Sequence, residues 1–341
     1  MGKIINLLLL MKCLYTTSIQ TEQLSHFPFP IDIVYLWVDG SDTQWQDIKN
    51  YYHALLYGRI PAAADEFSEN RFADHEELRY SLRSIIKFAP FVNHIYIVTM
   101  NQKPYWLKPH PQISIIDHTE IFTNQDDLPT FNSHALESNL HRIPHLSEFY
   151  IYFNDDVFLG APVTPYDFFT VDGKVNVLFE RSLSPSGPPI PDETAYRRAW
   201  RNTNAYLDAH FTVEPRHRLS HSAFAVRKSF VEATETACSA IFTTNSSHKF
   251  RCNQDYNMVN GFLQYYWSYY DLIRTGSISN MMVSLRDDTQ FEKTKKNIAR
   301  LKKNKPHTFC LQDVMGNNSS KTQQLLQKFL QESYPDPAPW E

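Results

Sequence analysis

The chain has 341 residues, of which 42% are hydrophobic and 21% are charged, a composition that supports a globular fold with a sizeable core. Its formal net charge of −4 disfavours binding to nucleic acid through a broadly basic surface. The cysteines, Cys13, Cys238, Cys252 and Cys310, contain no CxxC pair. This spacing argues against structural zinc and a disulfide scaffold, and it favours reduced thiols in a cytoplasmic protein.

The N-terminal region, residues 1–25, is predicted to be a flexible segment ahead of a single catalytic domain at residues 26–341. Its apolar run at residues 4–11 is too short to span a bilayer, and no A-x-A-like cleavage site follows it. We therefore expect a cytoplasmic protein with at most peripheral contact with the inner face of the membrane. The sequons at Asn245, Asn317 and Asn318 leave secretion open as the alternative.

The first half of the domain alternates predicted strands with predicted helices. The strands are 31–38, 94–100, 113–116 and 149–153, and the helices are 74–89 and 133–143. This order predicts an α/β fold, with a mainly parallel, Rossmann-like sheet covered by helices on both faces.

The second half follows a Pro-rich loop at residues 182–191 and is predicted to be mostly helical. Its expected helices are 193–208, 224–237, 255–272 and 321–331. We assign residues 26–180 to the α/β core and residues 181–341 to a helical part that completes the active site.

Two acidic turns follow predicted strands, at Asp39 to Asp42 and at Asn154-Asp155-Asp156. Ligands of parallel sheets bind beyond the carboxyl ends of the strands, so these turns indicate the position of a site. Adjacent carboxylates there are suited to Mg²⁺ (or Mn²⁺) and, through it, to substrate phosphates. The alternative is a solvated turn or helix cap, which Asp and Asn also favour. None of the 9 glycines lies in a GxGxxG or P-loop motif, so phosphate binding would depend on side chains and a metal.

Three further residues are candidates for chemistry. Asp32 lies inside an apolar run, where an unpaired carboxylate would be costly to bury, unless it is exposed in the first turn of the strand. His221 has the chemistry of a general base or acid, and Arg251 that of a bidentate phosphate ligand. The residue types alone do not distinguish His221 from His217.

Four blocks of the sequence together resemble the Stealth family of hexose-1-phosphate transferases, which act in microbial capsule synthesis. The blocks are IDIVYLWVDGSD (31–42), RFADHEELRYSLRSI (71–85), LPTFNSHALESNLHRI (128–143) and FYIYFNDDVFLG (149–160). The family includes the catalytic subunit of animal GlcNAc-1-phosphotransferase. Later blocks agree with it, at residues 201–207, 221–228, 248–255, 310–314 and 334–341.

The resemblance implies a role for each matching residue. It implies that Asp32, Asp156, His221 and Arg251 are catalytic and that Asp155 and Asp156 bind the metal. The residues implied to contact substrate are Asp39, Arg79, Ser133, Glu137, Asn154, Arg201 and Asp313. The spacing 201–221–251 selects His221 over His217.

The sequence departs from the animal enzyme in three places. Asp39 stands where that enzyme has Asn, and Ser222-Ala223 replace the Met and Pro that follow its histidine. The large inserted domains that recognise protein acceptors are also missing, so we do not expect a glycoprotein acceptor.

The expected reaction is an in-line attack by a carbohydrate or polysaccharide hydroxyl on the β-phosphorus of a UDP-sugar similar to UDP-GlcNAc. UMP would leave and a phosphodiester would form, with His221 or Asp32 as the base. The alternatives are a metal-dependent glycosyltransferase that releases UDP and a non-catalytic carbohydrate-binding protein. A homodimer is left open.

Overall fold

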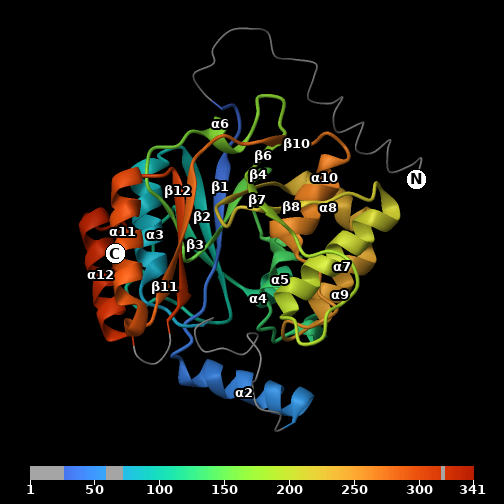
Figure 1. Cartoon of the computed structure of the whole chain (residues 1–341), viewed down its shortest axis with the longest axis horizontal. Coiled ribbons are helices and arrows are strands. Elements are labelled where there is room, and N and C mark those ends of the chain that lie inside the picture. Colours follow the sequence, from blue (N-terminus) through green and yellow to red (C-terminus); the bar gives the residue numbers. More distant parts are fainter. Residues whose placement is uncertain (1–26, 59–71, 316–318) are drawn as a thin grey trace.

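A five-stranded sheet forms the centre of the computed structural model, which describes residues 27–58, 72–315 and 319–341 (Figure 1). Its strand order is β3-β2-β1-β4-β9. The strands are β1 (Ile31–Leu36), β2 (Val92–Thr99), β3 (Ile113–Asp117), β4 (Phe149–Asn154) and β9 (Phe224–Arg227). The first four run parallel, and β9 pairs antiparallel with β4 at one edge. This arrangement confirms the predicted α/β class.

The central strands are buried along nearly their whole length. In β1, Ile33, Val34 and Tyr35 are fully inaccessible to solvent, and Phe149 to Phe153 of β4 are almost equally so. Continuous apolar strands of this kind fit only a sheet that is covered on both faces. Figure 1 shows helices on both sides of the sheet.

One predicted helix is confirmed and another is shorter than expected. The predicted helix 74–89 is α3 (Glu77–Phe88), but the predicted helix 133–143 ends early, as α5 (Ser133–Glu137). Ser138 Oγ donates to the His134 carbonyl, and Asn139 Nδ2 donates to the Ala135 carbonyl. Such side chain-to-backbone bonds compete with helix propagation, which accounts for the early end.

Nine further α-helices are present in the described residues. They are α2 (Thr43–Tyr57), α4 (His118–Ile121), α6 (Pro165–Phe168), α7 (Ala195–His210), α8 (Lys228–Ala237), α9 (Ser239–Ser247), α10 (Leu263–Ser268), α11 (Phe291–Asn304) and α12 (Ser320–Ser333). A π-helical turn at Met258–Phe262 precedes α10. Among the described residues, no helix is both long enough and apolar enough to cross a membrane.

The second half of the chain contains strands that the sequence analysis did not predict. A three-stranded sheet of order β11-β12-β5 joins β11 (Asn280–Arg286), β12 (Thr308–Val314) and β5 (Val157–Leu159). Two two-stranded pairs complete the architecture: β6 (Val175–Val177) with β10 (Ile273–Thr275), and β7 (Phe179–Leu183) with β8 (His217–Leu219). The predicted helix 224–237 was wrong at its start, because Phe224–Arg227 is strand β9 and only the remainder forms α8.

The segment between β4 and β5 connects the two larger sheets. Asn154 pairs with Leu36, so β1 and β4 end side by side, and the Asp155-Asp156 turn leads directly into β5. The Leu311 amide of β12 donates to the Asp156 carbonyl at 2.9 Å. The acidic turn is therefore fixed between the central sheet and the β11-β12-β5 sheet.

The structure describes one of the three sequon asparagines. Asn245 is fully buried and its side chain bonds the Tyr256 backbone through both polar atoms, at 3.0 and 2.8 Å, so it is inaccessible to glycosylation in this fold. Asn317, Asn318 and the predicted flexible segment 1–25 lie outside the described residues.

Candidate active site

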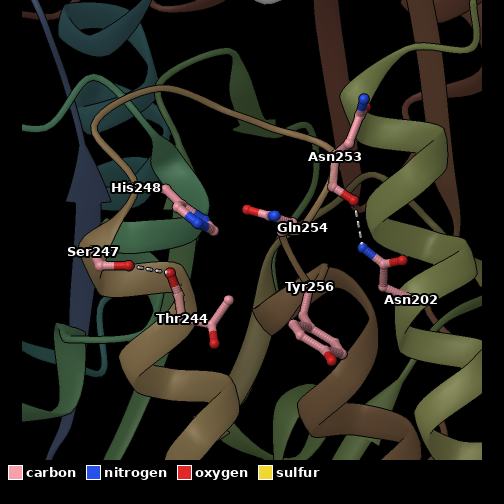
Figure 2. A pocket seen from close by; sticks show the side chains of 7 residues that line it. All are labelled: Asn202, Thr244, Ser247, His248, Asn253, Gln254 and Tyr256. Atoms are coloured by element: carbon pink, nitrogen blue, oxygen red, sulfur yellow. Dashed lines mark hydrogen bonds between the residues drawn. The ribbon is translucent and has the colours of Figure 1, made fainter. Parts of the chain in front are cut away.

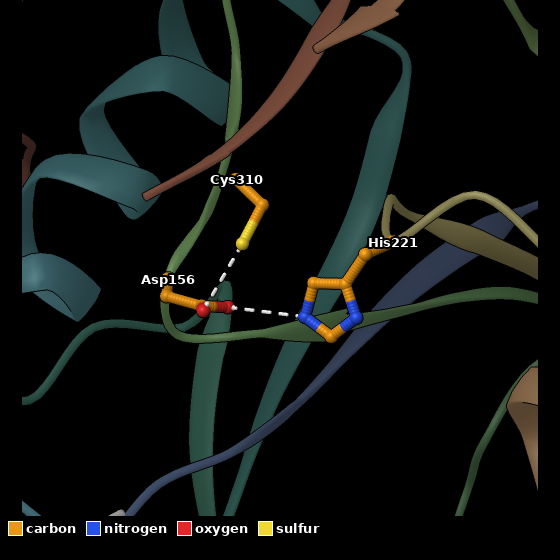
Figure 3. A group of neighbouring side chains, drawn as sticks. All are labelled: Asp156, His221 and Cys310. Carbon is orange, nitrogen blue, oxygen red and sulfur yellow. Dashed lines mark hydrogen bonds and ion pairs between the residues drawn. The ribbon is translucent and has the colours of Figure 1, made fainter. Parts of the chain in front are cut away.

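Asp156 lies at the carboxyl edge of the central sheet with one carboxylate oxygen engaged and the other not. Cys310 Sγ donates to Asp156 Oδ2 at 3.1 Å (Figure 3). In the described part of the chain, the buried Oδ1 atom has no hydrogen-bond partner. His221 Nε2 lies 3.8 Å from Oδ1, close enough for an ion pair but too far for a hydrogen bond. A buried carboxylate oxygen without a partner is costly, and a bound cation would remove that cost.

Other carboxylates gather around this turn. Burial raises the pKa of Asp155 well above its usual range, and the charges of Asp156, Glu77 and Asp74 raise it further. Burial also raises the pKa of Glu77 to about 7, with Asp74 adding to the effect. Mutual repulsion of this kind is the electrostatic environment in which a divalent cation binds favourably. The residues present therefore fit the predicted Mg²⁺ or Mn²⁺ site.

His221 has two neighbours that suit its two protonation states. Burial lowers the pKa of His221, but Asp156 more than offsets this, so its pKa lies above the ordinary value. The Asn154 Nδ2 atom lies 3.3 Å from the same ring nitrogen, Nε2. Because an amide nitrogen donates, that contact favours an unprotonated Nε2, whereas Asp156 favours a protonated one. The geometry suits a group that accepts a proton and then holds it.

A hydrogen-bonded chain connects His221 to α5. The Tyr152 hydroxyl lies 2.8 Å from Asn154 Oδ1 and 3.4 Å from Glu137 Oε1. Glu137 Oε2 accepts a bond from the Val259 amide at 3.2 Å. The structure therefore brings Glu137, Asn154, Asp156 and His221 into one connected group.

Arg251 contacts α5 one turn before Glu137. Its guanidinium donates to Ser133 Oγ at 2.6 Å, and Ser133 precedes Glu137 by four residues, which places the two on one helix face. Burial and the charge of Glu137 raise the pKa of Tyr152, while the charge of Arg251 acts in the opposite direction. Arg251 is thus within electrostatic reach of the Tyr152 hydroxyl.

The structure places Asp32 away from the other residues predicted to be catalytic, and its catalytic role stays a prediction. Asp32 is fully buried near the amino end of β1, where its carboxylate accepts bonds from the Ser147 amide at 2.7 Å and from Asn93 Nδ2 at 2.8 Å. It precedes Leu36, the end of the strand, by four residues, or about 13 Å at 3.3 Å per residue. Asp32 therefore anchors the opposite end of the sheet and does not reach Asp156.

Arg201 is engaged with the Pro-rich loop. Its Nε atom lies 2.8 Å from both carboxylate oxygens of Glu193, and its NH1 group donates to the Ser186 carbonyl. These contacts hold the loop against α7. The structure does not connect Arg201 to the Asp156 group, so its predicted contact with substrate stays a prediction.

Two further predicted residues, Asp313 and Arg79, form ion pairs with other side chains. Asp313 bonds His75 Nε2 at 3.2 Å, and His75 immediately follows Asp74. The Nε atom of Arg79 donates to a carboxylate oxygen of Glu341 at 2.6 Å.

Asp39 lies in the turn after β1. Its Oδ1 atom accepts bonds from the amide and the hydroxyl of Ser41, and its backbone bonds Gln102. It acts on the pKa of Asp74, so it belongs to the same acidic edge.

Sequence reasoning missed Asp74, His75, Glu77 and Cys310 as parts of the site. One signal was present for Glu77: it lies one turn before Ser81 and next to Leu78, on the buried face of α3, where a charged residue is rare. Cys310 gave no comparable signal, because its contact with Asp156 joins residues 154 positions apart.

The structure thus brings a carboxylate pair and a histidine to the carboxyl edge of the parallel sheet, the edge at which the ligands of such sheets bind. Three family models match the chain: Stealth protein conserved region 1 at residues 29–57, conserved region 2 at 71–177 and conserved region 4 at 299–341. The chain belongs to the Stealth family.

Curated relatives support this assignment. The chain is 37% identical over 297 residues to the capsular polysaccharide phosphotransferase LcbA of Neisseria meningitidis, covering 84% of this chain and 78% of that protein. It is 34% identical over 305 residues to the capsular polysaccharide phosphotransferase fcs1 of Haemophilus influenzae, and the match covers 87% of this chain and 82% of that protein. An exopolysaccharide phosphotransferase of Streptomyces coelicolor is 35% identical over 318 residues, but the chain spans only 52% of its length.

Among solved structures, the galactosyltransferase LgtC in complex with donor and acceptor sugar analogues is similar. The match has a TM-score of 0.43 at 11% sequence identity and covers 90% of this chain and 98% of that one.

Proposed function

We propose that this protein transfers a sugar-1-phosphate from a UDP-sugar similar to UDP-GlcNAc to a carbohydrate hydroxyl, forming a phosphodiester and releasing UMP. The proposed acceptor is a capsular or other cell-surface polysaccharide, in line with the names of the Neisseria and Haemophilus relatives. The observation that carries the proposal is the buried Oδ1 of Asp156, which has no hydrogen-bond partner among the described residues and lies 3.8 Å from His221 Nε2 at the carboxyl edge of the sheet.

Asp156 and Asp155 are the residues that would hold Mg²⁺ or Mn²⁺. Such an ion, when bound, neutralises charge on the diphosphate and helps to orient it. Asp156 Oδ1 is the atom best placed for this role, because Oδ2 is already bonded to Cys310.

His221 is the proposed general base. It would accept the proton of the attacking hydroxyl at Nε2, the ring nitrogen that faces Asp156. We favour His221 over Asp32, the other candidate that the sequence left open, because Asp32 bonds the Ser147 amide near the amino end of β1.

Arg251 is the proposed ligand of the phosphate oxygens. Its fixed, planar set of donors suits an anionic group better than a single ammonium would. Ser133 orients the guanidinium from α5 at 2.6 Å.

A product assay tests the proposal. The purified chain is incubated with Mg²⁺, a panel of UDP-sugars and oligosaccharide acceptors, and the released nucleotide is identified. UMP release that is lost in Asp156→Asn supports sugar-1-phosphate transfer. UDP release would indicate a glycosyltransferase, and no turnover with any donor would support a binding protein.

A further inference from the structure

A second cluster of potential metal ligands lies on the loop after α9, apart from the Asp156 group. It consists of His248, Cys252 and Asp255, and their ligand atoms lie within 4.8 Å of one another. His248 Nδ1 is 2.7 Å from Asp255 Oδ1, and Cys252 Sγ is 3.3 Å from His248 Nδ1 and 3.4 Å from Asp255 Oδ1. The three atoms therefore converge on one point.

Asp255 is held so that one oxygen faces this point. The residue is fully buried, and its Oδ2 atom accepts bonds from Asn132 Nδ2 at 3.0 Å, from His134 Nδ1 at 3.1 Å and from the Cys252 amide at 3.2 Å. Oδ1 is left to His248 and Cys252. Metal-binding carboxylates are commonly oriented by hydrogen bonds to the oxygen that does not bind the ion.

The cluster borders a pocket that gives access from solvent. The pocket has a volume of about 510 Å³ and is lined by Asn202, Thr244, Ser247, His248, Asn253, Gln254 and Tyr256 (Figure 2). The His248 side chain is 19% exposed and points into this space. The pocket has room for an ion to enter and for a water molecule as a further ligand.

We propose that His248, Cys252 and Asp255 bind a transition-metal ion of the zinc class, with a water molecule from the pocket as the fourth ligand. Imidazole, thiolate and carboxylate are the zinc donors, whereas Mg²⁺ prefers oxygen alone. Ligand bonds of about 2.0–2.3 Å in a tetrahedron separate the donor atoms by about 3.3–3.7 Å. A pair that includes sulfur is separated by about 3.5–3.6 Å, so the distances of 3.3 and 3.4 Å to Cys252 Sγ must open by only about 0.1–0.3 Å.

The third distance requires a small adjustment. The 2.7 Å between His248 Nδ1 and Asp255 Oδ1 is a hydrogen bond, and it must open by roughly 0.6 Å to admit the ion. Binding displaces the proton from Nδ1 and the proton from the Cys252 thiol. The thiolate and the carboxylate then neutralise the divalent ion, so the buried group carries no net charge.

The ion would fix the loop that carries Arg251. Arg251 lies between His248 and Cys252 in the sequence, and Asn132 and His134 connect Asp255 to the start of α5, where Ser133 receives the guanidinium. This consequence rests on the proposed function of Arg251. Metal binding itself does not, and it is measured without substrate.

The test titrates chelator-treated full-length protein with Zn²⁺ alone and with Co²⁺, whose charge-transfer absorption reports a thiolate ligand. We expect one high-affinity site and a cobalt–thiolate band in the wild type. Cys252→Ser, which keeps a small polar side chain but removes the thiolate, should lose the band and weaken zinc binding by at least about 10-fold. The matched control Cys238→Ser should leave both unchanged, since Cys238 lies elsewhere, beside Tyr206.

Asp156→Asn separates this site from the proposed active site. It should abolish sugar-1-phosphate transfer and leave the cobalt band intact. A band that survives Cys252→Ser, or one that disappears in Asp156→Asn, would overturn the proposal, as would wild-type protein that binds no zinc. Absence of transfer with an intact Cys252-dependent band would overturn the proposed function alone.

Discussion

Two clusters in this protein each join one aspartate, one histidine and one cysteine, and they differ in how fully the aspartate is satisfied. Asp255 is surrounded by His134, His248 and Asn132, and both of its oxygens have partners. Asp156 accepts a bond from Cys310 on one oxygen, and within residues 27–58, 72–315 and 319–341 its other oxygen has no hydrogen bond. The same residue types therefore form a closed group on a loop and an open group at the end of a strand.

The electrostatics of the two clusters differ in the same way. Burial opposes the charge of Asp255, but His134 and His248 outweigh burial and hold the pKa of Asp255 well below its usual range. Asp156 also keeps a lowered pKa, yet its neighbour Asp155 is pushed strongly upward by burial and by like charges. The partly neutralised carboxylate of Asp255 suits a structural ion held together with His248 and Cys252, whereas the unbalanced negative charge around Asp156 suits a hard cation that is bound together with substrate. We therefore assign chemistry to the open cluster and a structural role to the closed one.

Asp156→Asn should have the largest effect on activity. An amide is a poor ligand for a hard cation, and loss of several kcal/mol of transition-state stabilisation corresponds to on the order of 10³-fold or more in rate. Product formation measures this, and thermal unfolding should show that the fold is kept. EDTA should abolish the activity of the wild-type protein, and this loss should be reversible. Full activity in EDTA would contradict a metal at the open cluster.

His221→Ala should lower kcat by about 10²-fold or more with little change in donor KM, because the lost interaction is made in the transition state. His217 is exposed on β8, so His217→Ala serves as the matched control and should leave kcat nearly unchanged. Equal losses in both variants would contradict the assignment of His221 as the base.

The pH dependence sharpens the same assignment. A base must be unprotonated to act, and the pKa of His221 lies above the ordinary histidine value because of Asp156. Activity should therefore fall as the pH drops through that raised pKa. A pH–rate profile of kcat/KM should show this acidic limb in the wild type and not in His221→Ala.

The closed cluster should govern stability. The bond to Asp255 raises the pKa of His248 to about 10. In metal-free protein, His248 therefore contributes fully to the free energy of unfolding below about pH 6.5, and this contribution is lost as the pH rises toward 10. The contribution of Asp255 to the free energy of unfolding is present above about pH 4 and is lost as the pH falls below that value. Asp255→Asn should cost about 3–5 kcal/mol, because it breaks a buried charge pair. Denaturant unfolding at several pH values measures both effects, and flat profiles would contradict them.

Asp32→Asn should have the smallest effect on turnover. The substitution weakens the bonds to Ser147 and Asn93 and should cost about 1–3 kcal/mol of stability. Because Asp32 lies at the amino end of β1, kcat per folded molecule should stay near the wild-type value. A loss of kcat comparable with that of His221→Ala would restore Asp32 as a catalytic residue.

The part of the fold that could be predicted from the sequence is the part made of local patterns. The apolar runs of β1, β2, β3 and β4 are unambiguous, since buried parallel strands need apolar residues on both faces. Phe224–Arg227 was assigned to a helix because its apolar residues also fit helical spacing. Its pairing with Phe149–Tyr152 depends on residues about 75 positions away.

The site was predictable to a smaller extent. Asn154-Asp155-Asp156 is visible as an acidic turn after a strand, but His221 and Arg251 were found only through resemblance to a family. Asp32 shows a limit of sequence patterns, since a buried carboxylate that bonds the Ser147 amide has the same sequence signature as a catalytic one.

The proposed zinc site has no CxxC pair, the sequence pattern that is typical of structural zinc. His248, Cys252 and Asp255 are close in sequence, yet their convergence depends on His134 and Asn132, more than 100 positions earlier. Contacts of that range are set by tertiary packing, which a local pattern does not encode.

The most direct test of the account follows the β-phosphorus of the donor. A UDP-sugar that carries a radiolabel on this atom is incubated with Mg²⁺, acceptor and protein, and the label is located after separation of the products. We expect the label in the acceptor as a phosphatase-resistant sugar phosphodiester, with unlabelled UMP released and no transfer in Asp156→Asn. Label recovered in UDP would show attack at the anomeric carbon and would contradict the proposed phosphotransferase activity.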